Sequence, residues 1–64
     1  MGYSIRQARV GVGKTQEEMA AAVGLQPQTY RKYEKNPQKT PYWLAKAIAN
    51  TAGIALTELD LDRA

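Results

Sequence analysis

The sequence predicts an all-α fold of four to five short helices. Apolar residues recur at the three- and four-residue spacing of helix faces from Ile5 to Leu59. A capping residue or an early proline stands before most of these stretches, and glycine or Asn-Pro follows most of them. No segment alternates apolar and polar residues with the period of a strand. A chain of 64 residues has room for one small core, so we treat residues 1–64 as a single domain.

The first helix is expected over Ser4–Val10. Ser4 and Gln7 have the spacing of a capping box, in which each side chain bonds the other residue's backbone amide. Gly11 and Gly13 follow and are expected to end the helix. The apolar face of this segment consists of Ile5, Ala8 and Val12.

The clearest helix start lies at Thr15, in the stretch "TQEE". Thr15 is expected to cap the free backbone amides of the first turn, and Glu18 to bond the amide of Thr15 in return. Gly24 ends this second helix, and Leu25 follows as an apolar plug. The inward-facing residues of the helix are Met19, Ala20 and Val23.

A third helix is expected to begin at Pro27, because proline suits the first helical position, where its missing N–H costs nothing. Tyr30 and Tyr33 lie three residues apart and share one face. The Asn36-Pro37 pair ends the helix. The other faces carry Gln28, Arg31, Lys32 and Lys35.

Two further helical segments follow. Thr40-Pro41 repeats the start in which a cap precedes a proline, and Gly53 ends the fourth helix. The stretch "IALTELDL" predicts a short last helix with Leu56 and Leu59 turned inward. The single tryptophan and the four tyrosines are interpreted as core residues rather than as a stacking platform, with a dimer contact as the alternative for the tryptophan. The apolar pattern of the fourth helix consists of Trp43, Leu44, Ala45, Ile48, Ala49 and Ala52.

The charges are unevenly distributed along the chain. The net charge of +3 combines eight basic and three acidic residues up to Lys46 with one basic and three acidic residues after it. Clustered positive charge and a pI near 9.5 suit a polyanionic partner. Ordinary surface charge explains the same distribution about as well, so charge alone does not identify a partner.

The residue types exclude several classes of site. The chain has no cysteine and no histidine, which removes disulfides, thiolate metal sites and the commonest general base. We expect no catalytic residues, no cofactor and no metal ion. No stretch approaches the roughly 20 apolar residues that cross a bilayer, and none resembles a signal peptide. A cytoplasmic protein without membrane contacts is therefore the default expectation.

The stretch "ARVGVGKT", residues 8–15, matches the looser pattern of a phosphate-binding loop. Such a loop needs a buried strand before it and a helix after it, whereas "MGYSIRQ" is too short and polar for a central strand. A turn between helices explains the two glycines better, with Lys14 at the edge of the second helix and Thr15 as its cap. We therefore expect no nucleotide to bind, and measurable ATP affinity would revive the enzyme hypothesis.

The stretch "TQEEMAAAVGLQPQTYRKYE", with "TPYWLAKAIANTAGIALTEL" after it, resembles the Cro/C1-type (XRE-like) helix-turn-helix family of phage and bacterial regulators. The likeness extends from about Ile5 to Leu59. It implies a lambda-repressor-like DNA-binding domain with its helix-turn-helix at about residues 15–35. The sequence departs from the family pattern at Tyr30 and Tyr33, where aliphatic residues are usual, and in "KNPQK", which lacks a glycine often found there.

The resemblance and the spacing together indicate how DNA would be bound. The second helix of such a pair lies in the major groove, where its N-terminal side chains contact base edges. Glutamine can pair with adenine and lysine with guanine, whereas proline can make only apolar contacts, for example with a thymine methyl group. The residues expected to contact bases are Gln26, Pro27, Gln28 and Lys32. The residues expected to contact phosphates are Lys14, Gln16, Thr29, Arg31, Lys35 and Lys39, and the role of Gln16 is implied by the family resemblance.

Structural roles are expected at three positions. Thr15 caps the second helix, and the resemblance implies an ion pair between Arg9 and Glu34 that ties the first helix to the end of the third. Simpler alternatives remain open for the polar surface. Gln16, Gln28 and Lys32 could be ordinary solvated helix residues, and Lys35 and Lys39 could be solubilising charges.

The sequence thus predicts a sequence-specific, double-stranded DNA-binding transcriptional regulator of repressor type. We expect a homodimer on a palindromic operator, associated with the nucleoid of a bacterial or phage-infected cell. Its dimer surface is placed around the fourth and fifth helices, because Trp43, Ile54 and Leu56 exceed what so small a core requires. The alternative function is an antitoxin or adaptor that uses the same fold mainly to bind another protein.

Overall fold

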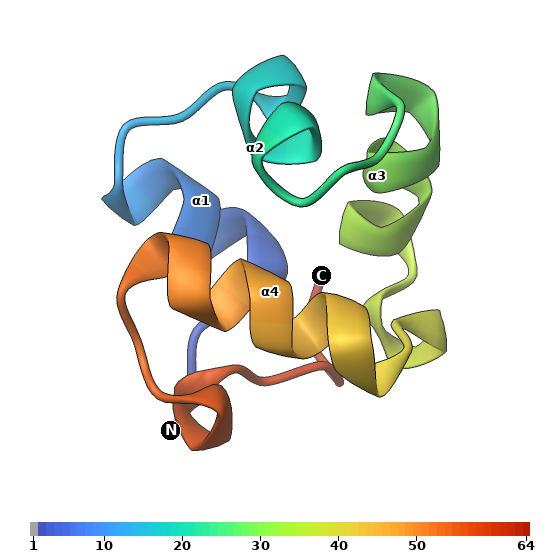
Figure 1. The fold of residues 1–64 in the computed structure, drawn as a ribbon. Helices are drawn as coiled ribbons and strands as arrows, with labels where there is room; N and C mark the ends of the chain where they lie inside the picture. The colour runs from blue at the N-terminus through green and yellow to red at the C-terminus, as the bar shows by residue number, and fades with distance from the viewer. Residues whose placement is uncertain (1) are drawn as a thin grey trace.

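A computed structural model describes residues 2–64 of the chain. Four α-helices and two short 3-10 helices follow one another along the chain (Figure 1). Their bounds are α1 (Ile5–Gly11), α2 (Gln16–Ala22), α3 (Pro27–Lys35), η1 (Pro37–Lys39), α4 (Tyr42–Ala52) and η2 (Leu56–Glu58). The all-α prediction is therefore confirmed, with 3-10 turns where the sequence suggested a loop after α3 and a short last helix.

Both capping boxes predicted from the sequence are present. The Ser4 hydroxyl accepts a hydrogen bond from the Gln7 amide at 3.0 Å, and the Gln7 side chain accepts one from the Ser4 amide at 2.9 Å. Thr15 and Glu18 repeat the arrangement at 3.1 and 2.9 Å. Amides that would lack partners in a first helical turn are satisfied locally in this way. The starts of α1 and α2 are thus determined by short-range chemistry.

The turns after α1 and α2 depend on glycine. Gly13 has a φ of 69° and Gly24 a φ of 77°, which side chains with a Cβ rarely adopt. The first helix extends to Gly11, one residue beyond the predicted end at Val10. Because Gly11 keeps helical geometry, Gly13 alone supplies the left-handed turn toward α2. Gly24 performs the same task between α2 and α3 and produces the sharp bend between the two helices.

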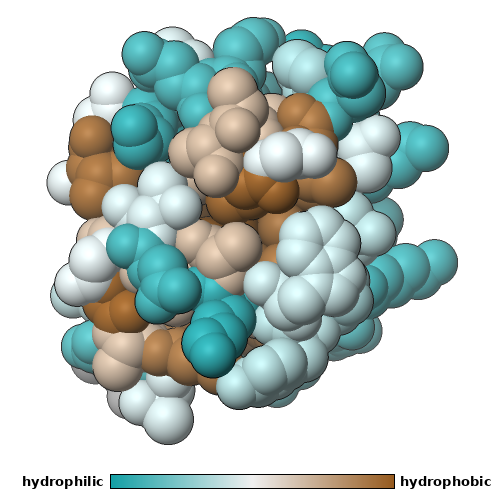
Figure 2. All heavy atoms as spheres, viewed as in Figure 1, coloured by the Kyte–Doolittle hydropathy of each residue, from teal (hydrophilic) through white to brown (hydrophobic). Residues whose placement is uncertain are grey.

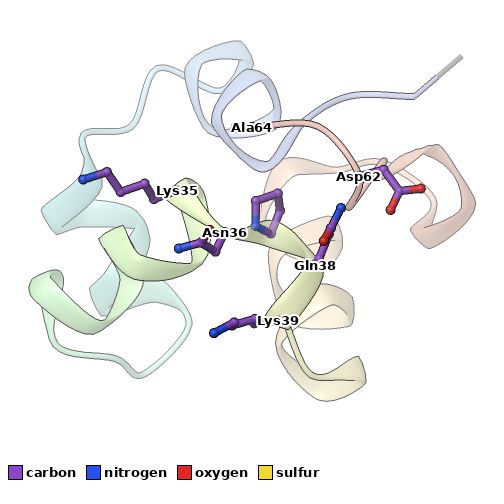
Figure 3. A pocket seen from close by; sticks show the side chains of 7 residues that line it. Lys35, Asn36, Gln38, Lys39, Asp62 and Ala64 are labelled. Atoms are coloured by element: carbon purple, nitrogen blue, oxygen red, sulfur yellow. The ribbon is translucent and has the colours of Figure 1, made fainter.

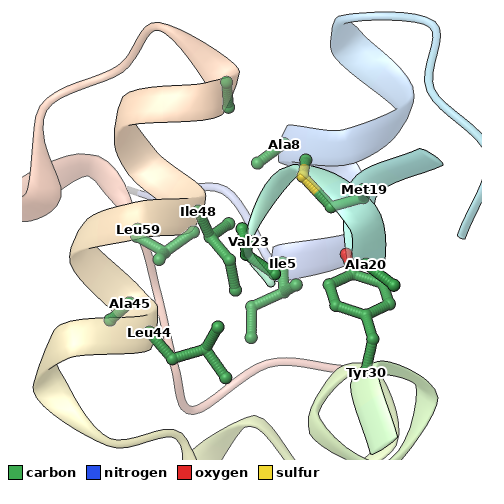
Figure 4. Packing of buried hydrophobic residues seen from close by; sticks show 11 residues of the cluster. Ile5, Ala8, Met19, Ala20, Val23, Tyr30, Leu44, Ala45, Ile48 and Leu59 are labelled. Carbon is green, nitrogen blue, oxygen red and sulfur yellow. The ribbon is translucent and has the colours of Figure 1, made fainter. Parts of the chain in front are cut away.

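The core lies where the four helices meet. In Figure 4 side chains from α1, α2, α3 and α4 converge on one cluster, to which Leu59 is added from the C-terminal segment. Helix α1 packs on α4, and α2 packs on α3. The largest fully buried side chain is Tyr30 of α3. The buried apolar residues are Ile5, Ala8, Met19, Ala20, Val23, Tyr30, Leu44, Ala45, Ile48, Ala49, Ala52 and Leu59.

Several residues predicted to face the core do not. Tyr3, Tyr42 and Trp43 are each about half exposed or more, so the expectation that the tryptophan and all the tyrosines belong to the core was wrong. Trp43 precedes the fully buried Leu44 by one residue, which rotates its side chain by about 100° around the helix, away from the buried stripe. Val12 is also exposed, because α1 ends before it and it occupies the C-cap instead of the helix face.

The start of α4 also differs from the prediction. Thr40 was expected to cap this helix, but Pro41 occupies the cap position and the helix begins at Tyr42. Thr40 instead ends the 3-10 helix η1, and its buried hydroxyl has no hydrogen-bond partner in the described chain. The preceding Asn36-Pro37 pair does end α3, as predicted. The 3-10 helix η1 follows directly, so the residues before Pro41 belong to η1 and its end.

The two ends of the described chain are joined by backbone hydrogen bonds. Tyr3 donates its amide to the Glu58 carbonyl and accepts a bond from the Asp60 amide, both at 2.7 Å. This parallel bridge between Tyr3 and Leu59 is isolated, and residues 2–64 contain no strand. It holds the segment after η2 beside the start of α1. No helix within these residues is long and apolar enough to cross a membrane.

The hydroxyl of Tyr30 generates a test of the core. It is buried without a hydrogen-bond partner in the described chain, and the pKa of Tyr30 is raised, mainly by burial and then by the nearby Glu34 carboxylate. Tyr30→Phe is therefore expected to leave the free energy of unfolding unchanged or to increase it by up to about 1 kcal/mol. Tyr30→Ala should lower it by about 3–5 kcal/mol, because it leaves a cavity.

Urea unfolding followed by circular dichroism measures both variants. A loss of more than about 1 kcal/mol in Tyr30→Phe would contradict this account. It would mean that the hydroxyl makes a hydrogen bond, most directly to Glu34.

Candidate nucleic-acid interface

Helices α2 and α3 form a helix-turn-helix pair whose second helix is exposed along one side. Pro27 takes the first helical position, and Gln26 is the N-cap. The Gln26 side chain makes no capping hydrogen bond, so its amide group remains available to a ligand. Gln28 and Lys32 are both exposed and lie four residues apart, which places them on the same side of α3. Figure 2 shows that the rim formed by α2 and α3 is mostly hydrophilic.

The opposite side of α3 is anchored in the protein. Tyr30 is fully buried, and Glu34 is 8% exposed despite its charge. These two residues are four apart, so they form the inward stripe of the helix. Because one stripe is fixed in the core, the position of the exposed stripe relative to α1 and α2 is fixed as well.

A hydrogen-bonded network around Glu34 connects the first three helices. Arg9 of α1 donates from Nε to Glu34 Oε2 at 2.6 Å, so the ion pair expected between these residues is present. Gln16 of α2 donates from Nε2 to Glu34 Oε1 at 3.1 Å. Arg9 also donates to the Lys14 carbonyl in the turn between α1 and α2 at 2.9 Å. One buried carboxylate therefore receives donors from two other helices.

The charges in this network are stabilised by one another. Burial opposes the ionised form of Glu34, but Arg9 and, after it, the neighbouring Tyr30 and Gln16 side chains favour that form more strongly, so the pKa of Glu34 is lowered. The pKa of Arg9 is raised, chiefly by its hydrogen bond to Glu34. A charge with 7% side-chain exposure is tolerated only when it is paired in this manner. Glu34 is thus a structural carboxylate that holds α3 in place.

Gln16 connects this network to the surface of α3. Its Oε1 accepts a hydrogen bond from Arg31 Nε at 3.2 Å, while its Nε2 donates to Glu34. These two bonds fix the orientation of the side-chain amide. A glutamine amide nitrogen carries two N–H donors, and the bond to Glu34 uses one of them. The other is left for an acceptor outside the network.

Two shallow hollows flank the exposed side of α3. One is lined by Thr29, Lys32, Tyr33, Asn36 and Lys39. The other is lined by Arg6, Gln16, Arg31, Glu34, Lys35 and Ala64. Each contains at least two cationic side chains, and apart from the internally paired Glu34 neither contains an acidic one. Such hollows suit the phosphates of a polyanion.

The turn after α3 adds to the cationic surface. Lys35, Asn36 and Lys39 project to the same side of the chain in Figure 3, whereas Asp62 points away on the other side. The acidic C-terminal segment therefore approaches η1 without covering the lysine side chains. Lys35 and Lys39 are both exposed.

The structure brings together most, but not all, of the residues selected from the sequence. Lys14 is half-buried in the turn before α2, apart from the two hollows. Arg31 is not free, because its Nη2 forms an ion pair with Glu17 at 3.1 Å. Two residues that sequence reasoning did not select, Arg6 and Asn36, line the hollows. Their charge and polarity were visible in the sequence, but their position beside α3 depends on how α1 and η1 pack.

The segment that resembles a phosphate loop has a different context here. Residues 8–11 are the last part of α1, and Thr15 is the N-cap of α2. A helix precedes the glycines where a phosphate loop has a buried strand. The Lys14 carbonyl receives a bond from Arg9, so the turn is part of the network around Glu34.

Comparison with known families agrees with this geometry. Residues 5–59 match the family described as Helix-turn-helix, over a span that includes α1 through η2. The chain belongs to the Cro/C1-type (XRE) helix-turn-helix family. Domains of this family bind DNA and are typically non-catalytic. The chain has no significant match among the curated proteins or the solved structures compared with it.

The network around Glu34 predicts a measurable coupling in this helix-turn-helix domain. Arg9→Ala and Glu34→Ala should each destabilise the protein, and the double variant should lose less than the two losses added together. The expected coupling energy at pH 7 is about 0.5–3 kcal/mol, because either single change leaves the other charge buried without its partner. Urea unfolding of the parent, the two single variants and the double variant measures this coupling energy.

The same cycle has a defined pH dependence. The pKa of Glu34 is lowered in the folded state, so its contribution is fully present above the ordinary carboxyl pKa and is lost as the pH falls through the folded value. The coupling should therefore disappear in acid. A coupling near zero at pH 7 would contradict the structural role assigned to the pair.

Proposed function

We propose that this protein is a sequence-specific, double-stranded DNA-binding transcriptional regulator, repressor-like in type, that regulates by occupying a promoter. One observation carries the proposal. An exposed stripe with Gln28 and Lys32 lies on a helix whose other side is anchored by Tyr30 and Glu34. A rigid helix with readable side chains on its outer face is what major-groove recognition requires.

Base contacts are assigned to the N-terminal half of α3. Gln26, whose side chain makes no capping hydrogen bond, and the exposed Gln28 supply amides that can bond adenine at two positions. Lys32 can donate to guanine one turn later. Pro27, which is half-buried, is left with an apolar contact such as a thymine methyl group. Because each such pairing discriminates by about 1–3 kcal/mol, a few of them suffice for a preferred site.

Phosphate contacts are assigned to the residues around the two hollows beside α3. Gln16 has a second amide N–H available and a fixed orientation. Lys35 and Lys39 are exposed cations on the same side of the chain. The further candidates are Lys14, Thr29 and Arg31. These contacts fix the orientation of the protein on the duplex and contribute affinity that is independent of sequence.

We further propose that the protein acts as a homodimer on a palindromic operator. The sequence suggested a dimer surface that includes Trp43, Ile54 and Leu56. Ile54 and Leu56 pack against the core and are only partly exposed, so we remove them from this surface. Tyr42 and Trp43, which are 69% and 56% exposed at the start of α4, remain as large, mostly exposed aromatic side chains. Exposed aromatic residues of this kind are typical of protein contacts.

The same aromatic pair supports the second candidate function, an antitoxin or adaptor that binds another protein. The two functions differ in their DNA binding. An adaptor would bind duplexes weakly, with no sequence preference and a strong dependence on salt, and would form a stable complex with its partner.

Base reading and phosphate binding predict different patterns for two variants. Gln28→Ala should lower affinity for the preferred site by about 1–3 kcal/mol and relax the choice at one base pair. Lys35→Ala should weaken all duplexes similarly and reduce the slope of log affinity against log salt by about one unit. Fluorescence anisotropy with preferred and random duplexes separates the two. Equal losses on both duplexes would remove Gln28 from base reading.

Dimeric binding predicts the form of the operator. Selection of bound sites from random duplex DNA should return an inverted repeat with half-site centres separated by about one helical turn or a multiple of it. A variant with Tyr42→Ala and Trp43→Ala should sediment as a monomer and bind both half-sites without cooperativity. Recovery of a single, non-repeated site would contradict the dimer, and recovery of no site would favour the adaptor.

A further inference from the structure

Arg31 and Glu17 form a contact that the DNA-binding assignment does not use. Arg31 is the one proposed phosphate ligand in the described chain whose charge is paired with a carboxylate. Its Nη2 lies 3.1 Å from Glu17 Oε2, and its Nε donates to Gln16 Oε1 at 3.2 Å. The side chains are 46% and 61% exposed, so the pair lies at the surface, open to an incoming anion.

Gln16 and Glu17 together occupy one edge of the Arg31 guanidinium group. Nε and Nη2 form the side-on edge that binds a carboxylate or a phosphate in a bidentate manner. In the free chain this edge is divided between the Gln16 oxygen and the Glu17 carboxylate. A phosphate with two acceptor oxygens would compete directly with Glu17 for it. The side chains of Arg6 and Lys35 line the same hollow as Arg31 and would attract the phosphate.

The geometry points to Glu17 as a built-in competitor that weakens DNA binding by holding Arg31, a phosphate ligand, in an intramolecular ion pair. This inference rests on the proposed function, because it concerns how the same surface binds DNA. A DNA phosphate that binds Arg31 must either displace Glu17 or contact an Arg31 whose positive charge is already cancelled by Glu17. In both cases the presence of Glu17 lowers affinity for every duplex alike, since phosphate contacts do not read sequence.

The fold does not require Glu17 at this position. The cap of α2 is formed by Thr15 and Glu18, and Glu17 takes no part in it. Its pKa is lowered, first by a hydrogen bond from its own backbone amide and next by Arg31, so the contact with Arg31 favours the charged carboxylate. An exposed ion pair of this kind is weak. The expected effect is therefore an adjustment of affinity and not an on-off switch.

Glu17→Gln tests the inference, and Glu18→Gln is its matched control. Both variants remove one negative charge from the first turn of α2, and glutamine at position 18 still completes a capping box. In the described chain Glu18 bonds Thr15, whereas the hydrogen bonds of the Arg31 side chain go to Gln16 and Glu17. We expect Glu17→Gln to bind preferred and random duplexes about two- to five-fold more tightly than Glu18→Gln at low salt. This difference in affinity between the two variants should shrink at high salt, where exposed ion pairs are screened.

Removing Arg31 separates competition from general repulsion between Glu17 and DNA. In an Arg31→Ala chain the excess of Glu17→Gln over Glu18→Gln should vanish, and Arg31→Ala should cost more affinity in the Glu17→Gln chain than in the parent. Equal affinities of the two glutamine variants, or an excess that survives in Arg31→Ala, would overturn the inference. So would weaker binding by Glu17→Gln, which would mean that Glu17 positions Arg31 for phosphate. These outcomes leave the proposed function intact if the parent binds DNA, whereas failure of the parent to bind any duplex would overturn both.

Discussion

The buried carboxylate of Glu34 is the constraint on which the rest of this helix-turn-helix domain depends. It receives donors from Arg9 of α1 and Gln16 of α2, and it lies one turn from the buried Tyr30 on α3. A small core supplies little stability to spare, and an unpaired charge at this depth would be strongly destabilising. The three helices are therefore held in one relative position. That position determines which side of α3 faces outward.

The network also connects stability with the binding surface. Gln16 bonds Glu34 with one end of its amide and Arg31 with the other, so a side chain assigned to phosphate binding is oriented by the group that fixes the fold. A pre-oriented ligand loses less conformational entropy when DNA binds. Arg31 extends the chain of contacts to Glu17, at the outer rim. Structural and functional charges thus share one set of hydrogen bonds and are not segregated into separate regions.

Charge placement accounts for how a protein with a net charge of only +3 can present a cationic face. Of the three acidic residues before Lys46, Glu34 is neutralised by Arg9, Glu18 is engaged in the cap of α2, and Glu17 is paired with Arg31. The remaining acids lie near the C-terminus, where Asp62 points away from Lys35 and Lys39. The lysines beside α3 are consequently left without acidic partners in the described chain, and the local field there exceeds what net charge suggests.

The sequence by itself determined the features that depend on neighbouring residues. Capping boxes at Ser4 and Thr15, the proline at the start of α3 and the bend at Gly24 are local, so the starts of the first three helices could be predicted from spacing. The family resemblance then identified α2 and α3 as a helix-turn-helix pair. Helical spacing also identified most of the buried apolar residues, such as Met19 and Ile48. Only the tertiary structure decided where that pattern fails, because a helical pattern does not set the angle at which a helix meets its neighbours. It left Tyr42 and Trp43 in solvent. It also joined Arg31 to Glu17, 14 residues away, because that contact exists only once α2 and α3 have packed together.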